Sequence, residues 1–171
     1  MKVTGYMILD RIEALQERAS LLEDQFEPAL FRFRDESEQR PDPRELMRAY
    51  EQCERKIALL QEAQAHYNLR VSVTVAGETM TLQRAVKLIG TMGRIRNLWK
   101  EAVEDTEGRY LRPLRRQRDR DAEYAERVVS VAECLHSAEE AGRLATAFKQ
   151  AVRAGNATEV DLDLDPDVFK D

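Results

Sequence analysis

LMRAYEQCERKIALLQEAQAHY, residues 46–67, decides the fold class of this 171-residue chain. Within it one stripe recurs at alternating spacings of four and three residues, and the residues between are mostly charged or polar. The stripe consists of Leu46, Tyr50, Cys53, Ile57, Leu60, Gln64 and Tyr67. Such spacing is the seam of a coiled coil, so it predicts a long helix that packs along one narrow face.

A second seam of the same kind lies upstream. Its positions are Ile8, Ile12, Leu15, Ala19, Leu22, Phe26, Leu30 and Phe33. Pro28 is expected to kink or break this helix, because proline lacks a backbone donor and crowds the preceding turn. In the polar segment between the seams, Asp42 can cap the second helix with Pro43 at its first position. Two seamed helices joined by a short loop predict an antiparallel hairpin.

Beyond residue 68 the periodicity changes. Alternating valines predict a short strand near residues 69–76, and Ala76-Gly77-Glu78 would turn the chain. A third helix follows over residues 82–103, although Gly90 and Gly93 weaken it unless a close neighbour needs the space.

The C-terminal third predicts one more strand and one more helix. Residues 127–131 have the composition of a second short strand. Ser130 and Glu133 have the spacing of a capping box, which predicts a fourth helix that ends at Gly155-Asn156. The remaining residues, 158–171, predict an acidic C-terminal tail or a short strand.

The predicted fold class is therefore mainly α. It comprises a long antiparallel, coiled-coil-like helical hairpin, two further helices and a small β element. We expect a single helical domain over residues 1–157. The apolar fraction of 43% supports a real core, and the charged fraction of 35% fits long solvated helices.

Charge and hydropathy disfavour several classes of function and location for this chain. The net charge of -5 provides no global attraction for nucleic acid or anionic membranes. We find no apolar run of the roughly 20 residues that a membrane helix needs, and no signal-peptide pattern. Two cysteines, Cys53 and Cys134, fit a reducing compartment. A cytoplasmic location is the prediction.

The stretch NLRVSVTVAGETMTLQRAVKL, residues 68–88, resembles the septicolysin-like family of small bacterial proteins. In that family a helix ends in asparagine, a short strand leads to a glycine turn, and a helix that opens with Thr-Leu follows. The matching positions are Asn68, Gly77, Thr81, Leu82 and Ala85. Arg109-Tyr110 and the segment LATAFKQAVRAGN, residues 144–156, extend the likeness to residues 43–157.

The resemblance implies a helical hairpin with a small strand element, and the family name suggests a membrane-active cytolysin. This sequence departs from the family at Ala157, where tryptophan usually follows the asparagine, and has an insertion around residues 112–126. We therefore keep membrane lysis as a second alternative function.

An arginine cluster is the main candidate for ligand binding. It consists of Arg109, Arg112, Arg115, Arg116, Arg118 and Arg120. Arginine holds phosphates through forked donors, so the cluster could bind nucleic acid or another anion. Acidic residues precede and follow it, however, and only Tyr110 and Tyr124 could stack on bases. A local ion-pair network is the main interpretation, and anion binding is the alternative.

The sequence shows no constellation that predicts an enzyme. Cys53, His66, Cys134 and His136 could in principle hold zinc, but zinc sites favour closely spaced ligand pairs. Cys53 occupies a seam position, where a small apolar thiol packs in a core. We therefore predict no catalytic residues, no metal and no cofactor.

The seams run further than one chain is expected to cover. They predict a homo-oligomer that acts as a non-enzymatic structural or protein-interaction module, with another protein as a possible further partner. The predicted interface residues are Ile12, Leu15, Leu22, Phe26, Tyr50, Ile57 and Leu60.

Overall fold

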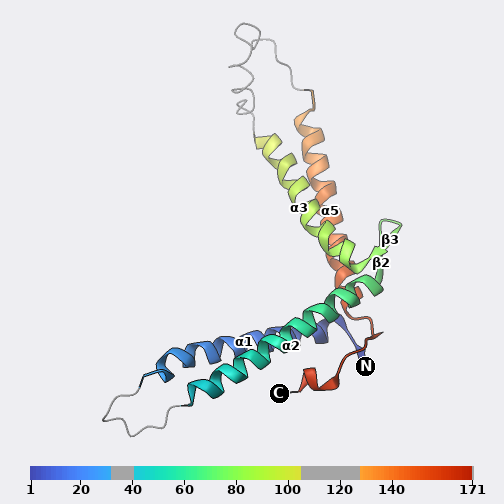
Figure 1. Ribbon diagram of the computed structural model, residues 1–171. Helices are drawn as coiled ribbons and strands as arrows, with labels where there is room; N and C mark the ends of the chain where they lie inside the picture. Colours follow the sequence, from blue (N-terminus) through green and yellow to red (C-terminus); the bar gives the residue numbers. More distant parts are fainter. Residues whose placement is uncertain (32–40, 105–127, 171) are drawn as a thin grey trace, which may run out of the picture. The chain divides into compact units, whose positions relative to one another are not determined.

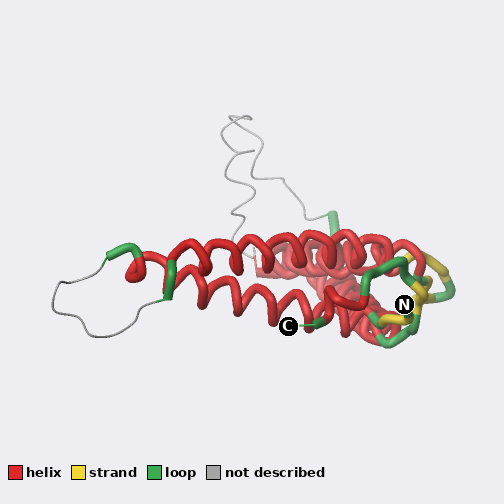
Figure 2. Tube along the Cα trace, turned by 60° about the horizontal axis from the view of Figure 1, so that its bottom comes forward, coloured by secondary structure: helices red, strands yellow, loops and turns green. Residues whose placement is uncertain are grey.

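The computed structural model describes residues 1–31, 41–104 and 128–170. This part of the chain is mainly helical with a small β element, which confirms the predicted fold class (Figures 1 and 2). The chain divides into two compact units. Unit 1 consists of Met1–Ser72, Thr81–Gln83 and Ala154–Asp171, and unit 2 of Val73–Met80 and Arg84–Arg153. Residues 1–157, which we expected as one domain, contribute to both units.

Helices α1 (Gly5–Ala29) and α2 (Pro43–Arg70) lie side by side as an antiparallel hairpin in unit 1 (Figure 1). The seam residues fill the contact between them. The buried apolar side chains are Ile8, Ile12, Leu15, Ala19, Leu46, Cys53, Ile57, Leu60, Ala63 and Tyr67. The expected seam is not buried along its whole length: Leu22, Phe26 and Tyr50 are half-buried, and Ala63 is buried in place of Gln64.

The ends of the two helices at the connecting loop follow the predicted signals. The Asp42 Oδ1 accepts a hydrogen bond of 2.8 Å from the backbone N–H of Arg44, and Pro43 is the first residue of α2. Pro28 lies in the last turn of α1, which ends one residue later. Leu30, a predicted seam residue, is therefore already outside the helix, and Phe33 lies outside the described residues.

A two-stranded sheet closes the opposite end of the α1–α2 hairpin. Strand β1 (Lys2–Val3) pairs antiparallel with β4 (Val160–Asp161), so that Val3 lies opposite Val160. Val3 and Leu162 are buried there. Residues 158–171 thus include the short strand that was one of the two predicted alternatives.

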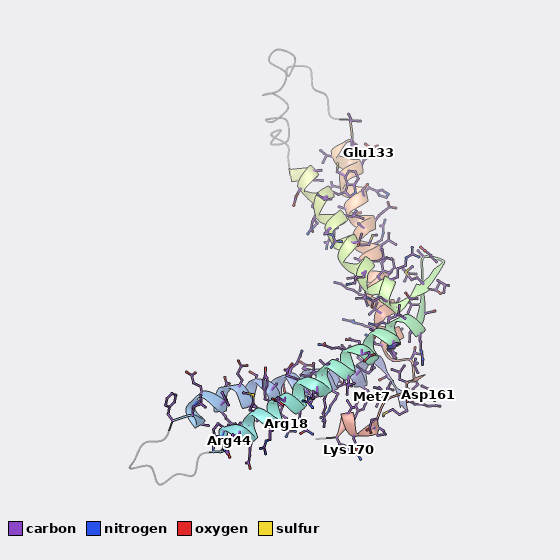
Figure 3. The ribbon with its side chains drawn as sticks, viewed as in Figure 1. Met7, Arg18, Arg44, Glu133, Asp161 and Lys170 are labelled. Atoms are coloured by element: carbon purple, nitrogen blue, oxygen red, sulfur yellow. The ribbon has the colours of Figure 1, made fainter. Side chains whose placement is uncertain are left out.

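The segment after β4 is tied to both helices. It forms the 3-10 helix η2 (Pro166–Phe169), which buries Val168. Arg11 donates from Nε to the carbonyl of Val168 at 3.2 Å, and Lys56 donates to the carbonyl of Lys170 at 2.7 Å. Figure 3 shows Lys170 beside the hairpin. Long basic side chains of α1 and α2 therefore hold the acidic segment against the hairpin.

The β element after α2 is a hairpin of β2 (Ser72–Val75) and β3 (Glu78–Thr81). Ala76 and Gly77 form its turn with positive φ angles of 52° and 84°. Consecutive positive φ values match the right-handed twist of paired strands, which explains the tight two-residue connection. The predicted strand and turn are present, whereas the partner strand β3 was not predicted.

Helices α3 (Leu82–Glu104) and α5 (Val131–Asn156) form a second hairpin, most of it in unit 2 (Figure 1). The α3 glycines do not serve close packing on a described neighbour. A Cβ added at Gly93 would meet no described atom within 4 Å, and one added at Gly90 would meet only the tip of Arg94.

Helix α5 begins where we expected a strand. Of the strand predicted for residues 127–131, residue 127 lies outside the described residues; Val128–Ser130 are irregular and Val131 opens the helix, so the described part forms no strand. Ser130 and Glu133 form the predicted capping box: Ser130 N donates to Glu133 Oε2 at 2.8 Å, and Glu133 N donates to Ser130 Oγ at 3.2 Å. Hydrogen bonds from Ser130 hold the pKa of Glu133 below its usual value. Capping by these two residues overrides the β propensity of the valines.

Candidate interaction surfaces

The predicted interface residues fall into two groups. Ile12, Leu15, Ile57 and Leu60 are buried between α1 and α2. Leu22, Phe26 and Tyr50 are only half-buried. The first group is covered by the neighbouring helix of the same chain, a contact that avoids the entropy cost of association. The second group remains open to another molecule.

An apolar cleft opens between α1 and α2 at the end of the hairpin next to the connecting loop. We call it the tip cleft. It has a volume of about 250 Å³ and is lined by Leu22, Glu23, Phe26, Leu46, Met47 and Tyr50. The seam is well packed at Ala19, which is 5% exposed, whereas Met47 in the cleft wall is 38% exposed. The cleft is therefore the part of the seam that the hairpin leaves unfilled.

The two helix ends beside the tip cleft carry opposite net charges, although the first turn of α2 also holds one carboxylate, Glu45. The last two turns of α1 hold Glu23, Asp24 and Glu27 and no basic residue, while the first turns of α2 hold Arg44 and Arg48. Figure 3 shows Arg44 at this end of the hairpin. Within the described ranges, none of these five side chains has an ion-pair partner. Their charges are available to a partner.

Tyr67 connects three parts of unit 1 at the other end of the hairpin. Its side chain is fully buried, and its hydroxyl oxygen lies 2.7 Å from the carbonyl oxygens of both Gly155 and Thr158, which share its single proton as acceptors. Its ring faces Gly5 at the start of α1. Burial raises the pKa of the Tyr67 hydroxyl above its ordinary value. Tyr67 therefore joins α2 to the end of α5 and to the start of α1.

Replacing Tyr67 by phenylalanine is expected to cost about 1–3 kcal/mol of unfolding free energy, because the buried carbonyl of Gly155 would lose its donor. The raised pKa means that the folded state holds the phenolic proton more tightly than the unfolded state does. Tyr67 therefore contributes stability below pH of about 10, and this contribution is lost as the pH rises further. Urea unfolding at neutral and alkaline pH measures both effects. A difference between wild type and variant that does not shrink above pH of about 10 would contradict the assignment.

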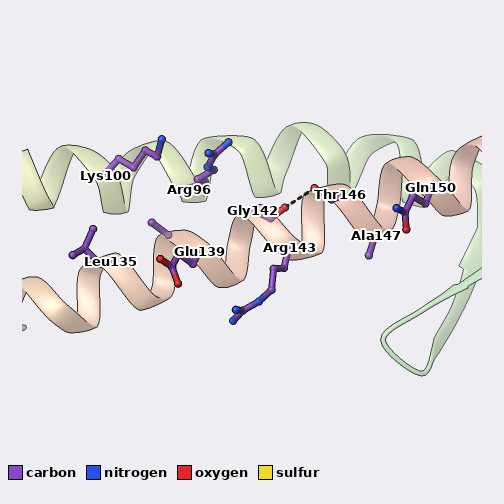
Figure 4. Close-up of a pocket in the computed structure, with 10 residues that line it drawn as sticks. Arg96, Lys100, Leu135, Glu139, Gly142, Arg143, Thr146, Ala147 and Gln150 are labelled. Atoms are coloured by element: carbon purple, nitrogen blue, oxygen red, sulfur yellow. Dashed lines mark hydrogen bonds between the residues drawn. The ribbon is translucent and has the colours of Figure 1, made fainter.

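A larger groove runs between α3 and α5 in unit 2 (Figure 4). We call it the α3–α5 groove, and its volume is about 730 Å³. It is lined by Arg96, Lys100, Leu135, Ala138, Glu139, Gly142, Arg143, Thr146, Ala147 and Gln150. None of these residues was predicted from the sequence as a binding residue. The spacing of Arg96 and Lys100 in the sequence does indicate that both lie on one face of a helix. Only the fold shows that this face borders the small residues of α5.

The cysteines and histidines are not gathered into a metal site in the described part of the chain. Cys53 and Cys134 are both buried and form no disulfide, and one lies in each unit. His66 and His136 are exposed, each within 4 Å of a glutamate of its own helix. No group of three or more His, Cys, Asp and Glu side chains among the described residues could hold a metal ion.

The remaining sequence predictions concern anions and membranes. The arginine cluster from Arg109 to Arg120 lies outside the described residues, so anion binding there stays a prediction. Every helix in residues 1–31, 41–104 and 128–170 is too short or too polar to cross a lipid bilayer.

No protein-family model, curated protein or solved structure matches this chain. The resemblance to the septicolysin-like family, carried by residues such as Asn68, Gly77 and Thr81, therefore stays a prediction. The tip cleft, the α3–α5 groove and their charges are therefore the features that bear on function.

Proposed function

We propose that this protein is a non-enzymatic interaction module that self-associates through the tip cleft of the α1–α2 hairpin. The observation that carries the proposal is that Leu22, Phe26 and Tyr50 line an unfilled apolar cleft at the end of a well-packed seam. Removing such apolar surface from water is the main favourable term in protein association. These three side chains also belong to the heptad pattern that predicted self-association.

The surface around the cleft can extend the contact. A stable interface buries about 800 Å² on each partner, which is more than a cleft of this size supplies. Leu21 and Leu30, near the end of α1, are 61% and 52% exposed and add apolar surface. A rim of charged side chains around an apolar centre is the usual composition of a protein interface.

The charges favour a second copy in a two-fold arrangement. In a two-fold dimer the same patch is used on both copies, so the α1 end of one can face the α2 end of the other. In this arrangement Glu23 and Glu27 of each copy face Arg44 and Arg48 of the other, so the same contact is made twice in the dimer. Pairing α1 with α1 would instead bring carboxylates together, which disfavours that alternative.

Charge reversal provides the test. We expect sedimentation equilibrium to show a reversible dimer for the wild-type chain. Glu23→Lys/Glu27→Lys should weaken dimerisation about tenfold or more, and Arg44→Glu/Arg48→Glu should do the same, because each places like charges across the interface. An equimolar mixture of the two variants should form a one-to-one dimer again, because both contacts then pair opposite charges.

Glu13→Lys/Glu17→Lys is the matched control, since it reverses two exposed carboxylates of α1 that do not line the tip cleft. It should leave the dimer intact. A wild-type chain that stays monomeric at concentrations on the order of 100 μM would refute self-association at useful affinity. A mixture that associates no better than either variant alone would refute the two-fold contact.

A further inference from the structure

We infer that the α3–α5 groove is a docking site for an acidic amphipathic helix of a partner protein. This goes beyond the proposed self-association, because it concerns a different surface in a different unit and a partner of different charge.

The groove is long enough to hold several turns of a helix. Its α5 wall extends from Leu135 to Gln150, which at 1.5 Å per residue is a length of roughly 22 Å. Small residues recur along this wall, at Ala138, Gly142 and Ala147. Figure 4 shows Gly142 and Ala147 on α5. Small residues such as Ala138 and Ala147 let a third helix approach this wall, and helix-in-groove recognition uses an apolar floor of this kind. At Gly142 the side chain of Arg96 contacts the floor, because a Cβ added there would lie 3.4 Å from Nε and 3.6 Å from Cδ of Arg96. The Thr146 hydroxyl already donates to the carbonyl of Gly142 at 3.0 Å, so this part of the floor presents little free hydrogen-bonding capacity.

The rim of the groove is basic. Arg96 and Lys100 stand one turn apart on α3, and Figure 4 shows both on the α3 wall. Neither has an ion-pair partner among the described residues. Arg143 on α5 lies 4.0 Å from Glu140, and both side chains are mostly exposed, so this pair is weak. Glu139 is the one carboxylate in the lining. Carboxylates that flank the apolar stripe of a docked helix would meet Arg96 and Lys100.

The same charges disfavour a second copy of this groove as the occupant. Pairing two α3–α5 grooves would bring Arg96 and Lys100 of each copy toward the same cations of the other, and like charges across an interface repel each other. Nucleic acid is disfavoured as well, because the described residues of the lining include no aromatic side chain on which a base could stack. A partner helix with its own carboxylates satisfies both the apolar floor and the basic rim.

The probe is a fluorescein-labelled synthetic peptide of about 20 residues, with leucine and alanine on one helical face and glutamate on the other. Its fluorescence anisotropy is measured as the full-length protein is added. We expect saturable binding that weakens about tenfold or more in Arg96→Glu/Lys100→Glu. A second peptide with lysine in place of every glutamate should bind this variant better than it binds the wild-type protein.

Lys87→Glu/Arg94→Glu is the matched control, because it makes the same change in net charge on α3 with residues that do not line the groove. It should bind the acidic peptide like the wild-type chain. Thr146→Trp fills the groove without changing its charge and should also abolish binding. Circular dichroism spectra that match the wild type show that each variant is folded.

Three outcomes would overturn the inference: equal binding of the acidic and basic peptides, equal weakening by the control variant, or unchanged binding by Thr146→Trp. Tighter binding of a thymidine oligonucleotide that displaces the acidic peptide would assign the groove to nucleic acid instead. The charge-reversed tip-cleft variants should bind the peptide normally. Failure of self-association therefore leaves this result unaffected, and each proposal is tested separately.

Discussion

Gly5→Ala is expected to lower the free energy of unfolding of unit 1 by about 2–3 kcal/mol, near the upper range for overpacking a core. A Cβ at this position would lie 2.9 Å from Cε1 of Tyr67 and 3.1 Å from Cα of Asn156. Both distances are shorter than a normal carbon–carbon contact of at least about 3.5 Å. Tyr67 is fully buried and the Asn156 atom belongs to the backbone, so neither can move aside cheaply.

Urea unfolding monitored by circular dichroism measures this effect. Gly93→Ala in α3 is the matched control, because its Cβ would meet no described atom within 4 Å. There alanine should stabilise the helix by about 0.5–1 kcal/mol, through the lower entropy of the unfolded chain. If Gly5→Ala lowered the free energy of unfolding no more than Gly93→Ala does, the result would contradict the close packing of Gly5 against Tyr67 and Asn156.

Leu60→Ala should cost about 2–5 kcal/mol, the range for deleting a large aliphatic side chain from a core. Leu60 has no exposed surface, whereas its neighbour Leu59 is 50% exposed on the same helix. Leu59→Ala is therefore the control, and its cost should stay at or below about 1 kcal/mol. Comparing neighbours of the same residue type removes differences in helix propensity.

The Leu60 result also bears on the role of the seam. The heptad pattern predicts Leu60 as an interface residue, while the structure buries it between α1 and α2. If it stabilises the folded chain itself, the loss of stability in Leu60→Ala should not depend on protein concentration. If it stabilised an interface between copies, the loss would grow as the protein is diluted, because association is linked to concentration. A strong concentration dependence would contradict the intramolecular assignment.

The sequence predicted much of the fold because its signals are local. The seams of α1 and α2, the Asp42 cap and the Ser130–Glu133 capping box each depend on residues within one or two turns. In the described part of residues 127–131 the predicted strand is absent because two local signals overlap there, and the hydrogen bonds of the cap are stronger than the β preference of valine. Strand β3 was missed since Glu78–Thr81 has no marked alternation of its own and is ordered by pairing with β2.

The candidate surfaces were predicted less well. Leu22, Phe26 and Tyr50 were identified by the heptad pattern and line the tip cleft. The same pattern also selected Ile12, Leu15, Ile57 and Leu60, which are core. A period of 3.5 residues identifies a face that is buried, but it does not distinguish burial against a helix of the same chain from burial against a partner.

Residue order by itself was enough to predict long helices, their apolar faces and their caps, because periodicity and capping act within a few residues of the chain. The tertiary structure decided which seam residues are covered and which remain open, since that depends on where α1, α2, α3 and α5 end relative to their neighbours. It alone brought Arg96 and Lys100 of α3 beside Gly142 of α5, and Gly5 beside Tyr67 and Asn156. Such contacts join residues far apart in the chain, and no local pattern records them.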